Sequence, residues 1–264
     1  MTFHMPTASK PKASLAPESH TLPQFQAVRT ARAFEEIADQ IRAELADGRL
    51  KVGSRLPAER TLALQFGVSR NTLREALRSL EHAGLIRLQK GASGGAFISE
   101  GSGDAISTSL MDLYHVGTIT PDQLTEARIW LESVIVREAC RRATPEDIQA
   151  LQQNVDDAAE ATRRGDFQQR AKINLDFHRK LAAITANPIM VIVMDGLLNV
   201  LASFIQTIGE YENTFVPPSR KRFLKHMAAG DTDTAVAEME ASLKRLQRNY
   251  LSHAAASTGS KSPA

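Results

Sequence analysis

The chain has 264 residues, of which 42% are hydrophobic and 23% are charged, with a formal net charge of +2. These values allow two modest domains and are ordinary for a soluble globular protein. Its single cysteine, Cys140, excludes an internal disulfide and fits a reducing compartment. The N-terminus lacks the apolar core of a secretory signal, and we expect no membrane span and no membrane partner. The expected location is therefore the cytoplasm.

The charge is divided unevenly along the chain. Residues 27–99 carry twelve basic and eight acidic side chains, whereas residues 100–254 carry seventeen basic and twenty-one acidic ones. The first segment is therefore suited to a polyanionic partner and the second is not.

The first segment has the pattern of a small helical domain with a β-hairpin. Residues 1–26 lack periodicity and predict a disordered arm. An apolar stripe predicts a helix over residues 31–46. Pro57 begins a second helix, which ends at Gly67, and Ser69 is a good N-cap for a third. The core face of this third helix comprises Leu73, Ala76, Leu77 and Leu80. Two short strands, 85–88 and 96–99, flank a glycine-rich connection and complete a domain over residues 27–99.

The second segment reads as helical throughout. Residues 100–104 (EGSGD) form a hinge, residues 105–254 a second domain, and residues 255–264 a disordered tail. Glycines and X-Pro pairs separate the predicted helices. They span residues 105–115, 121–142, 145–164, 166–186, 188–209, 217–229 and 232–252. The fold class is therefore mainly α: a winged helix-turn-helix followed by an all-α antiparallel bundle.

The third helix has the features of a DNA-recognition helix. Arg70 and Arg74 lie one turn apart near its N-terminus, where positive charge opposes the helix dipole unless an anion compensates it. Arginine pairs with guanine and Asn71 can pair with adenine, while the hydroxyls of Ser69 and Thr72 can hold phosphate. The alternative is that these arginines only form surface ion pairs, such as Arg74 with Glu81 or Arg78 with Glu75.

The stretch LPAERTLALQFGVSRNTLREALRSLEHAGLIRLQKGASGGAFI (residues 56–98) closely resembles the DNA-binding domain of GntR-family transcription regulators. The segments LTEARIWLESVIVREACRRATPEDIQALQQNVDDA and NLDFHRKLAAITANP resemble the helical FCD effector domain of the FadR subfamily. Together the resemblance covers about residues 30–252. It implies operator contacts by a set of residues in the head: Arg60, Ser69, Arg70, Arg74, Lys90 and Gly91.

Three polar residues of the second segment lie on apolar helical stripes. Arg128 shares its stripe with Leu124 and Leu131, while Asn174 and His178 lie on one face of a later helix. If these polar side chains are buried, they need hydrogen-bonding or charged partners. Either Arg128 pairs with Glu132 and His178 bonds to backbone, or these side chains line a ligand cavity, as the resemblance implies.

The family commonly binds a divalent metal in that cavity through an Asp or Asn, a His four residues later and two further His. Asn174 and His178 match the first half of this pattern. Arg220 and Ser242 take the two remaining His positions, and one imidazole with one amide makes a poor site for a transition metal. We therefore expect no tightly held metal and no cofactor. Instead we expect a small anionic metabolite, such as an organic acid, a sugar acid or an acyl-CoA. The residues expected to hold it are Arg128, Asn174, His178, Arg220 and Ser242.

These features predict a ligand-responsive transcription regulator. We expect it to be a repressor that binds a palindromic operator as a homodimer. The alternative is an architectural protein that binds DNA without sequence preference, in which phosphate charge governs affinity. No catalytic set of side chains or phosphate-binding loop is recognisable, so we do not expect an enzyme.

Overall fold

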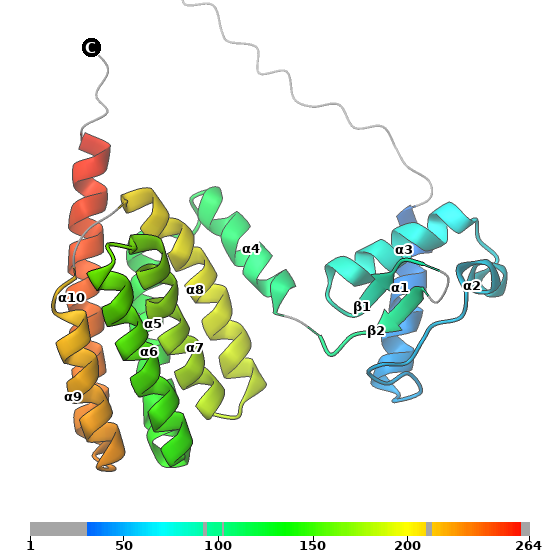
Figure 1. Cartoon of the computed structure of the whole chain (residues 1–264). Coiled ribbons are helices and arrows are strands. Elements are labelled where there is room, and N and C mark those ends of the chain that lie inside the picture. The colour runs from blue at the N-terminus through cyan, green and yellow to red at the C-terminus, as the bar shows by residue number, and fades with distance from the viewer. Residues whose placement is uncertain (1–30, 92–93, 102, 210–212, 260–264) are drawn as a thin grey trace, which may run out of the picture.

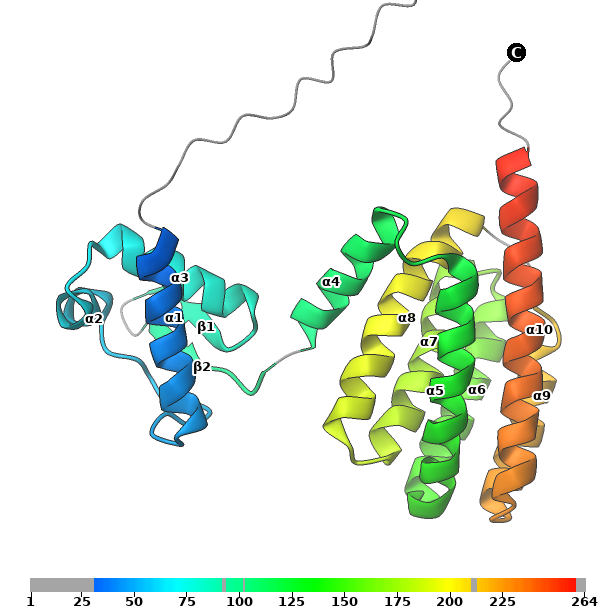
Figure 2. The ribbon, with the colours of Figure 1, turned by 180° about the vertical axis from the view of Figure 1, so that it is seen from behind.

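The computed structural model describes residues 31–91, 94–101, 103–209 and 213–259. Figures 1 and 2 show an N-terminal head and a bundle of long helices, joined through α4 (Asp104–His115). The expected mainly α class is confirmed. The predicted N-terminal arm, wing residues 92–93 and the end of the tail (260–264) lie outside the described residues.

The head contains α1 (Ala31–Ala46), α2 (Glu59–Phe66), α3 (Arg70–His82), β1 (Ile86–Gln89) and β2 (Gly95–Ile98). Ser69 caps α3 by accepting a hydrogen bond from the Thr72 backbone N–H (3.1 Å), as expected. Gly67 has a φ of 65°, which allows the tight turn between α2 and α3. The strands pair antiparallel, with Ile86 opposite Ile98. Side chains from all these elements form one core, including the four predicted for α3: Leu73, Ala76, Leu77 and Leu80.

The bundle is formed by α5 (Pro121–Arg142), α6 (Pro145–Arg163), α7 (Phe167–Ile184), α8 (Pro188–Ile208), α9 (Val216–Ala228) and α10 (Thr232–Gly259). Together with α4 these match the seven expected helices. Thr120 and Thr144 begin α5 and α6 with capping boxes, which explains why those two starts were predictable. The helix α10 runs further than the predicted 232–252 and into the predicted tail.

α8 is the most apolar helix of the bundle, with a mean hydropathy of 2.0 over an 18-residue window. By length and composition alone it is able to cross a membrane. A central bundle helix meets the same test, and α8 packs against α4, α5, α7 and α10. Its buried residues, among them Leu198 and Phe204, belong to the bundle core.

α4 lies along α8 and connects the bundle to the head (Figure 2). Gly196 of α8 allows this close approach, because a Cβ at that position would lie 2.9 Å from Leu110 Cδ1 of α4. Polar contacts continue from α8 in both directions. Asn199 donates to Ser107 Oγ of α4 (3.3 Å), and Arg179 of α7 donates to Asp195 (2.7 Å) and to Asn199 (2.8 Å) of α8.

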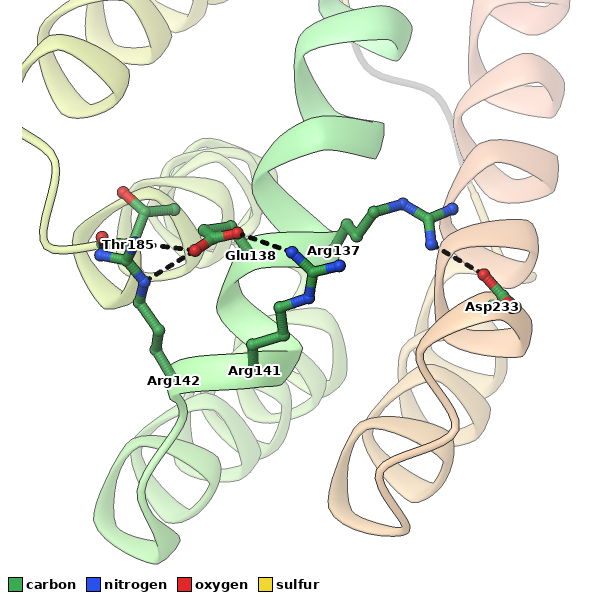
Figure 3. Close-up of polar contacts among 6 residues, drawn as sticks. All are labelled: Arg137, Glu138, Arg141, Arg142, Thr185 and Asp233. Atoms are coloured by element: carbon green, nitrogen blue, oxygen red, sulfur yellow. Dashed lines mark hydrogen bonds and ion pairs between the residues drawn. The ribbon is translucent and has the colours of Figure 1, made fainter.

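The C-terminal end of α5 is tied to two neighbouring helices by arginines (Figure 3). Arg142 pairs with Glu138 (2.7 Å) and also donates to the Thr185 carbonyl at the end of α7. Arg137 pairs with Asp233 of α10 (2.8 Å). These exposed pairs contribute about 0–1 kcal/mol each, so they orient the helix ends more than they stabilise the bundle.

Candidate DNA interface and effector pocket

The outer face of α3 presents the side chains predicted to contact DNA. Arg70, Asn71 and Arg74 are exposed, and the side chains of Arg70 and Asn71 have no hydrogen-bond partner within the described residues. The hydroxyls of Ser69 and Thr72 lie 2.9 Å apart at the helix start. Because the opposite face of α3 is fully buried, this outer face is held rigidly.

Two of the arginines on α3 form ion pairs. Arg74 Nε lies 2.8 Å from Glu59 Oε2 of α2, and Arg78 pairs with Glu75 at 3.4 Å, as one alternative expected. The expected pair of Arg74 with Glu81 is not formed, because Glu81 instead accepts the Leu88 backbone N–H (2.9 Å) and braces the hairpin. All four paired side chains are exposed, so water and DNA phosphates can compete for these arginines.

A groove of about 590 Å³ lies between α3 and the hairpin. Arg74, Lys90 and Gly91 line it, so the structure brings the recognition helix and the wing tip together. Arg60 is exposed on α2 but does not line this groove. The sequence analysis missed Arg55, which lines the groove and lies over the ring of Phe97 at 5.6 Å. No local pattern marks Arg55, since it precedes α2 in an extended segment.

The bundle contains a cavity of about 120 Å³ whose walls come from every bundle helix. Four of the five predicted effector-binding residues line it: Arg128, Asn174, His178 and Arg220. Ser242 lies next to them but faces a separate small void of about 10 Å³, which it shares with His178 and Arg220. The sequence analysis missed Tyr250 and Arg170, which also line the main cavity.

A buried hydrogen-bonded chain runs along the inner wall of this cavity. His178 Nδ1 lies 2.7 Å from Glu132 Oε1, and Arg220 Nη2 lies 3.2 Å from His178 Nε2. An arginine can only donate, so Nε2 accepts and Nδ1 carries the proton that it donates to Glu132. Burial, opposed by Glu132, lowers the pKa of His178 to about 4, so the imidazole is neutral at pH 7.

These hydrogen bonds correct one of the two alternatives that the sequence left open for the polar residues of the bundle. Glu132 was expected to pair with Arg128, one helical turn away, and His178 to bond to backbone. Instead Glu132 accepts from His178, which lies 46 residues further along the chain. The missed partner is thus Glu132, which is fully buried.

Two arginines that line the cavity, Arg128 and Arg220, are buried and incompletely paired. Arg220 donates to the Asn174 carbonyl (2.8 Å) and lies over the Phe177 ring at 4.0 Å, yet its Nη1 has no partner in the described part of the chain. Arg128 Nε likewise has none. Burial lowers the pKa of both guanidinium groups, that of Arg220 to about 9. Unpartnered buried donors are costly and uncommon, which marks this wall as a site for an acceptor.

The residues at this wall do not fit a metal ion. The His178 nitrogen that could face a metal already accepts from Arg220, and a guanidinium occupies the place of a further ligand. Asp176, which could supply a carboxylate, accepts from Asn154 Nδ2 instead (3.3 Å). In the described ranges, no three His, Cys, Asp or Glu side chains gather in a way that could hold a metal.

Comparisons with known proteins agree with this geometry. A family model described as "Bacterial regulatory proteins, gntR family" matches residues 33–97, and one described as "FCD domain" matches residues 123–245. A protein of Escherichia coli (strain K12), named as a regulator of the L-lactate dehydrogenase operon, is 32% identical over 241 residues. That alignment covers 84% of this chain and 91% of the relative. The chain belongs to the GntR family.

Other GntR-family relatives include the transcriptional repressor NanR of Klebsiella aerogenes. It is 30% identical over 181 residues, which cover 67% of this chain and 68% of the repressor. The solved structure of a Streptococcus agalactiae GntR protein has the same fold, with a TM-score of 0.58 at 23% identity; the match covers 81% of this chain and 99% of that one. This GntR-family protein is therefore a transcription regulator, with a DNA-binding head and an FCD effector-binding domain. Since the relatives are regulators, its place among them agrees with the expectation of a protein that is not an enzyme.

Proposed function

We propose that this GntR-family protein is a cytoplasmic, ligand-responsive repressor of the FadR subfamily, which binds a palindromic operator as a homodimer. The exposed arginines at the N-terminal end of α3, held on a buried core, carry this proposal. That end of a recognition helix enters the major groove, and arginine there reads guanine through two parallel hydrogen bonds. We assign phosphate contacts to Arg60, Ser69 and Thr72, and contacts at the wing tip to Lys90 and Gly91.

The DNA-contact assignment is tested by Arg70→Ala and Arg74→Ala in the full-length chain. We expect each variant to weaken binding to an operator selected from random DNA by about tenfold or more, because each removes a base contact worth about 1–3 kcal/mol. Fluorescence anisotropy measures the affinity. Arg141→Ala is the matched control, since it removes an exposed arginine of α5, in the bundle. Wild-type affinity in both head variants would contradict the assignment.

The homodimer is supported by apolar side chains that α4 and α8 leave uncovered. Ile106 is 47% exposed and Ile189 is 67% exposed, on helices that contact each other. A two-fold dimer would cover uncovered side chains of this kind with the same surface of a second copy. It also places two heads to read the halves of a palindrome.

The proposed effector is a small anion in the bundle cavity, held by Arg220 and Arg128. Asn174 and His178 line the same cavity, and Ser242 lies beside them. The E. coli relative named for the L-lactate dehydrogenase operon is consistent with an organic acid. Binding regulates the protein only if the anion prefers one arrangement of the heads.

We further propose that the cavity takes no tightly bound metal, because Arg220 occupies the position facing His178 Nε2. Protein purified without chelator is expected to contain substoichiometric zinc and nickel by elemental analysis. One metal ion per chain would contradict this proposal.

A further inference from the structure

The bundle cavity leads from an exposed side to a sealed end. Thr162 and Thr214 line it where their side chains are exposed to solvent. Arg128, His178 and Arg220 line it where the protein is closed, each at most 6% exposed. A ligand therefore has its polar group at the sealed end and any remainder toward the exposed side.

The sealed end presents two unpaired donors to the cavity. Glu132 Oε2 is also buried without a partner among the described residues, but Glu132 does not line the cavity. Arg128 Nε and Arg220 Nη1 are buried, and neither has a hydrogen-bond partner among the residues that the structure describes. Arg220 is fixed by its bonds to the Asn174 carbonyl and His178, so its free edge cannot swing to solvent. A carboxylate, with two oxygens, can accept from both arginines at once.

The charges at the sealed end leave one positive charge uncompensated. Arg128 and Arg220 are both cationic, Glu132 supplies one negative charge, and His178 is neutral. Inside a protein an excess charge is far more costly than in water. One negative charge balances the set, whereas two would leave an excess negative charge. Arg170 lines the half-exposed wall over Phe167, where water screens its charge.

The cavity is small and its walls are mostly apolar. Its volume of about 120 Å³ is somewhat less than the roughly 150 Å³ of a cavity that holds one benzene molecule. It therefore accommodates about six non-hydrogen atoms. Leu175, Ile205 and Leu246 line it and offer no hydrogen bond to a hydroxyl, whereas Thr162 and Thr214, which can, lie at the exposed side. Sugar acids and acyl-CoA molecules exceed this space, so most of such a ligand would lie outside the cavity, beyond its exposed side.

We propose that the effector is a short monocarboxylate, of about six non-hydrogen atoms, whose carboxylate is held between Arg128 and Arg220. This inference rests on the proposed function, since it narrows the class of anion that the FCD domain recognises. It replaces the wider set of organic acids, sugar acids and acyl-CoA molecules.

The test measures melting shifts and calorimetric affinities of the full-length chain at neutral pH with five probes. Propionate and L-lactate are short monocarboxylates, and propionamide is the neutral analogue. Malonate is a dianion of similar size, and glucuronate is a large monoanion. We expect propionate or L-lactate to raise the melting temperature, because a ligand of the folded state stabilises it. The other three should bind about tenfold more weakly or worse.

Different failures have different meanings. Tighter binding of malonate or glucuronate than of both short monocarboxylates would overturn the charge or the size argument, while leaving an anionic effector in place. The absence of binding by all four anions would overturn the anionic effector itself.

Arg128→Met tests the sealed end directly. The variant is expected to lose the propionate shift and to melt at or above the wild-type temperature without ligand, since it removes an unpaired buried charge. If Arg128 had a merely structural role, its replacement would lower the melting temperature instead. Wild-type propionate binding in Arg128→Met would overturn the proposal, and the melting curve itself shows that the variant is folded.

Discussion

The free energy of unfolding depends on pH through His178, because folding changes the affinity of this side chain for protons. Its pKa is about 4 in the folded chain and about 6.5 when unfolded, mainly because burial disfavours the imidazolium. The unfolded chain therefore binds the proton first as pH falls. The folded state therefore has its full stability from the neutral His178 above about pH 6.5, and this stability is lost progressively down to about pH 4.

We expect the free energy of unfolding, measured in urea between pH 7 and pH 4.5, to fall with a slope of up to about 1.4 kcal/mol per pH unit from this one group. His178→Asn keeps a donor for Glu132 but cannot titrate, so its profile should be flatter. Parallel profiles for the two proteins would show that His178 does not titrate on unfolding.

Single residues were predictable from sequence only where the local pattern exposed them. Arg128 and His178 stood out because a charged or titratable side chain interrupts an apolar stripe. Glu132 was visible only as a neighbour of Arg128 in the same helix. Its actual partner, His178, lies on another helix, and helical spacing carries no information about such contacts.

Helix ends were more predictable than single contacts because local chemistry determines them. Thr-Pro and Asn-Pro pairs cap the starts of α6 and α8, as expected. The end of α10 was not predictable, because residues 253–259 (HAAASTG) combine helix-favouring alanines with residues typical of tails. The packing of α4 on α8 also depends on Gly196, which the sequence analysis did not single out.

Gly196→Val is expected to separate α4 from α8. A Cβ at this position already comes within 2.9 Å of Leu110 Cδ1, and valine adds two further methyl groups. Overpacking of this kind costs about 1–3 kcal/mol, which urea unfolding of the variant measures. Gly196→Ala should cost less, since the Leu110 methyl can shift. A valine variant as stable as the wild type would show that α4 does not need this close contact.

At the scale of the whole molecule, the sequence predicted a head and a bundle but not which apolar side chains remain uncovered. The apolar residues of α8 were visible, yet only the structure shows that Ile189 is left uncovered while Leu198 is buried. Which apolar residues of a helix face the core depends on its neighbours, and these are known only in three dimensions.

The proposed dimer predicts a specific response to a charge on α8. Sedimentation equilibrium of the wild-type chain should give a dimer, and Ile189→Glu should weaken association by about tenfold or more, because it desolvates a charge in the interface. Trp130→Glu is the matched control, since Trp130 is similarly exposed (64%) but lies on α5. A greater effect of the control would place the interface on α5 instead.

The most direct measurement compares the affinity of the full-length chain for a palindrome selected from random DNA with its affinity for the same bases scrambled, at one salt concentration. Sequence-specific regulation predicts a preference of about a thousandfold or more for the palindrome. Equal affinity for both DNAs, governed by salt alone, would contradict it and identify an architectural DNA-binding protein instead.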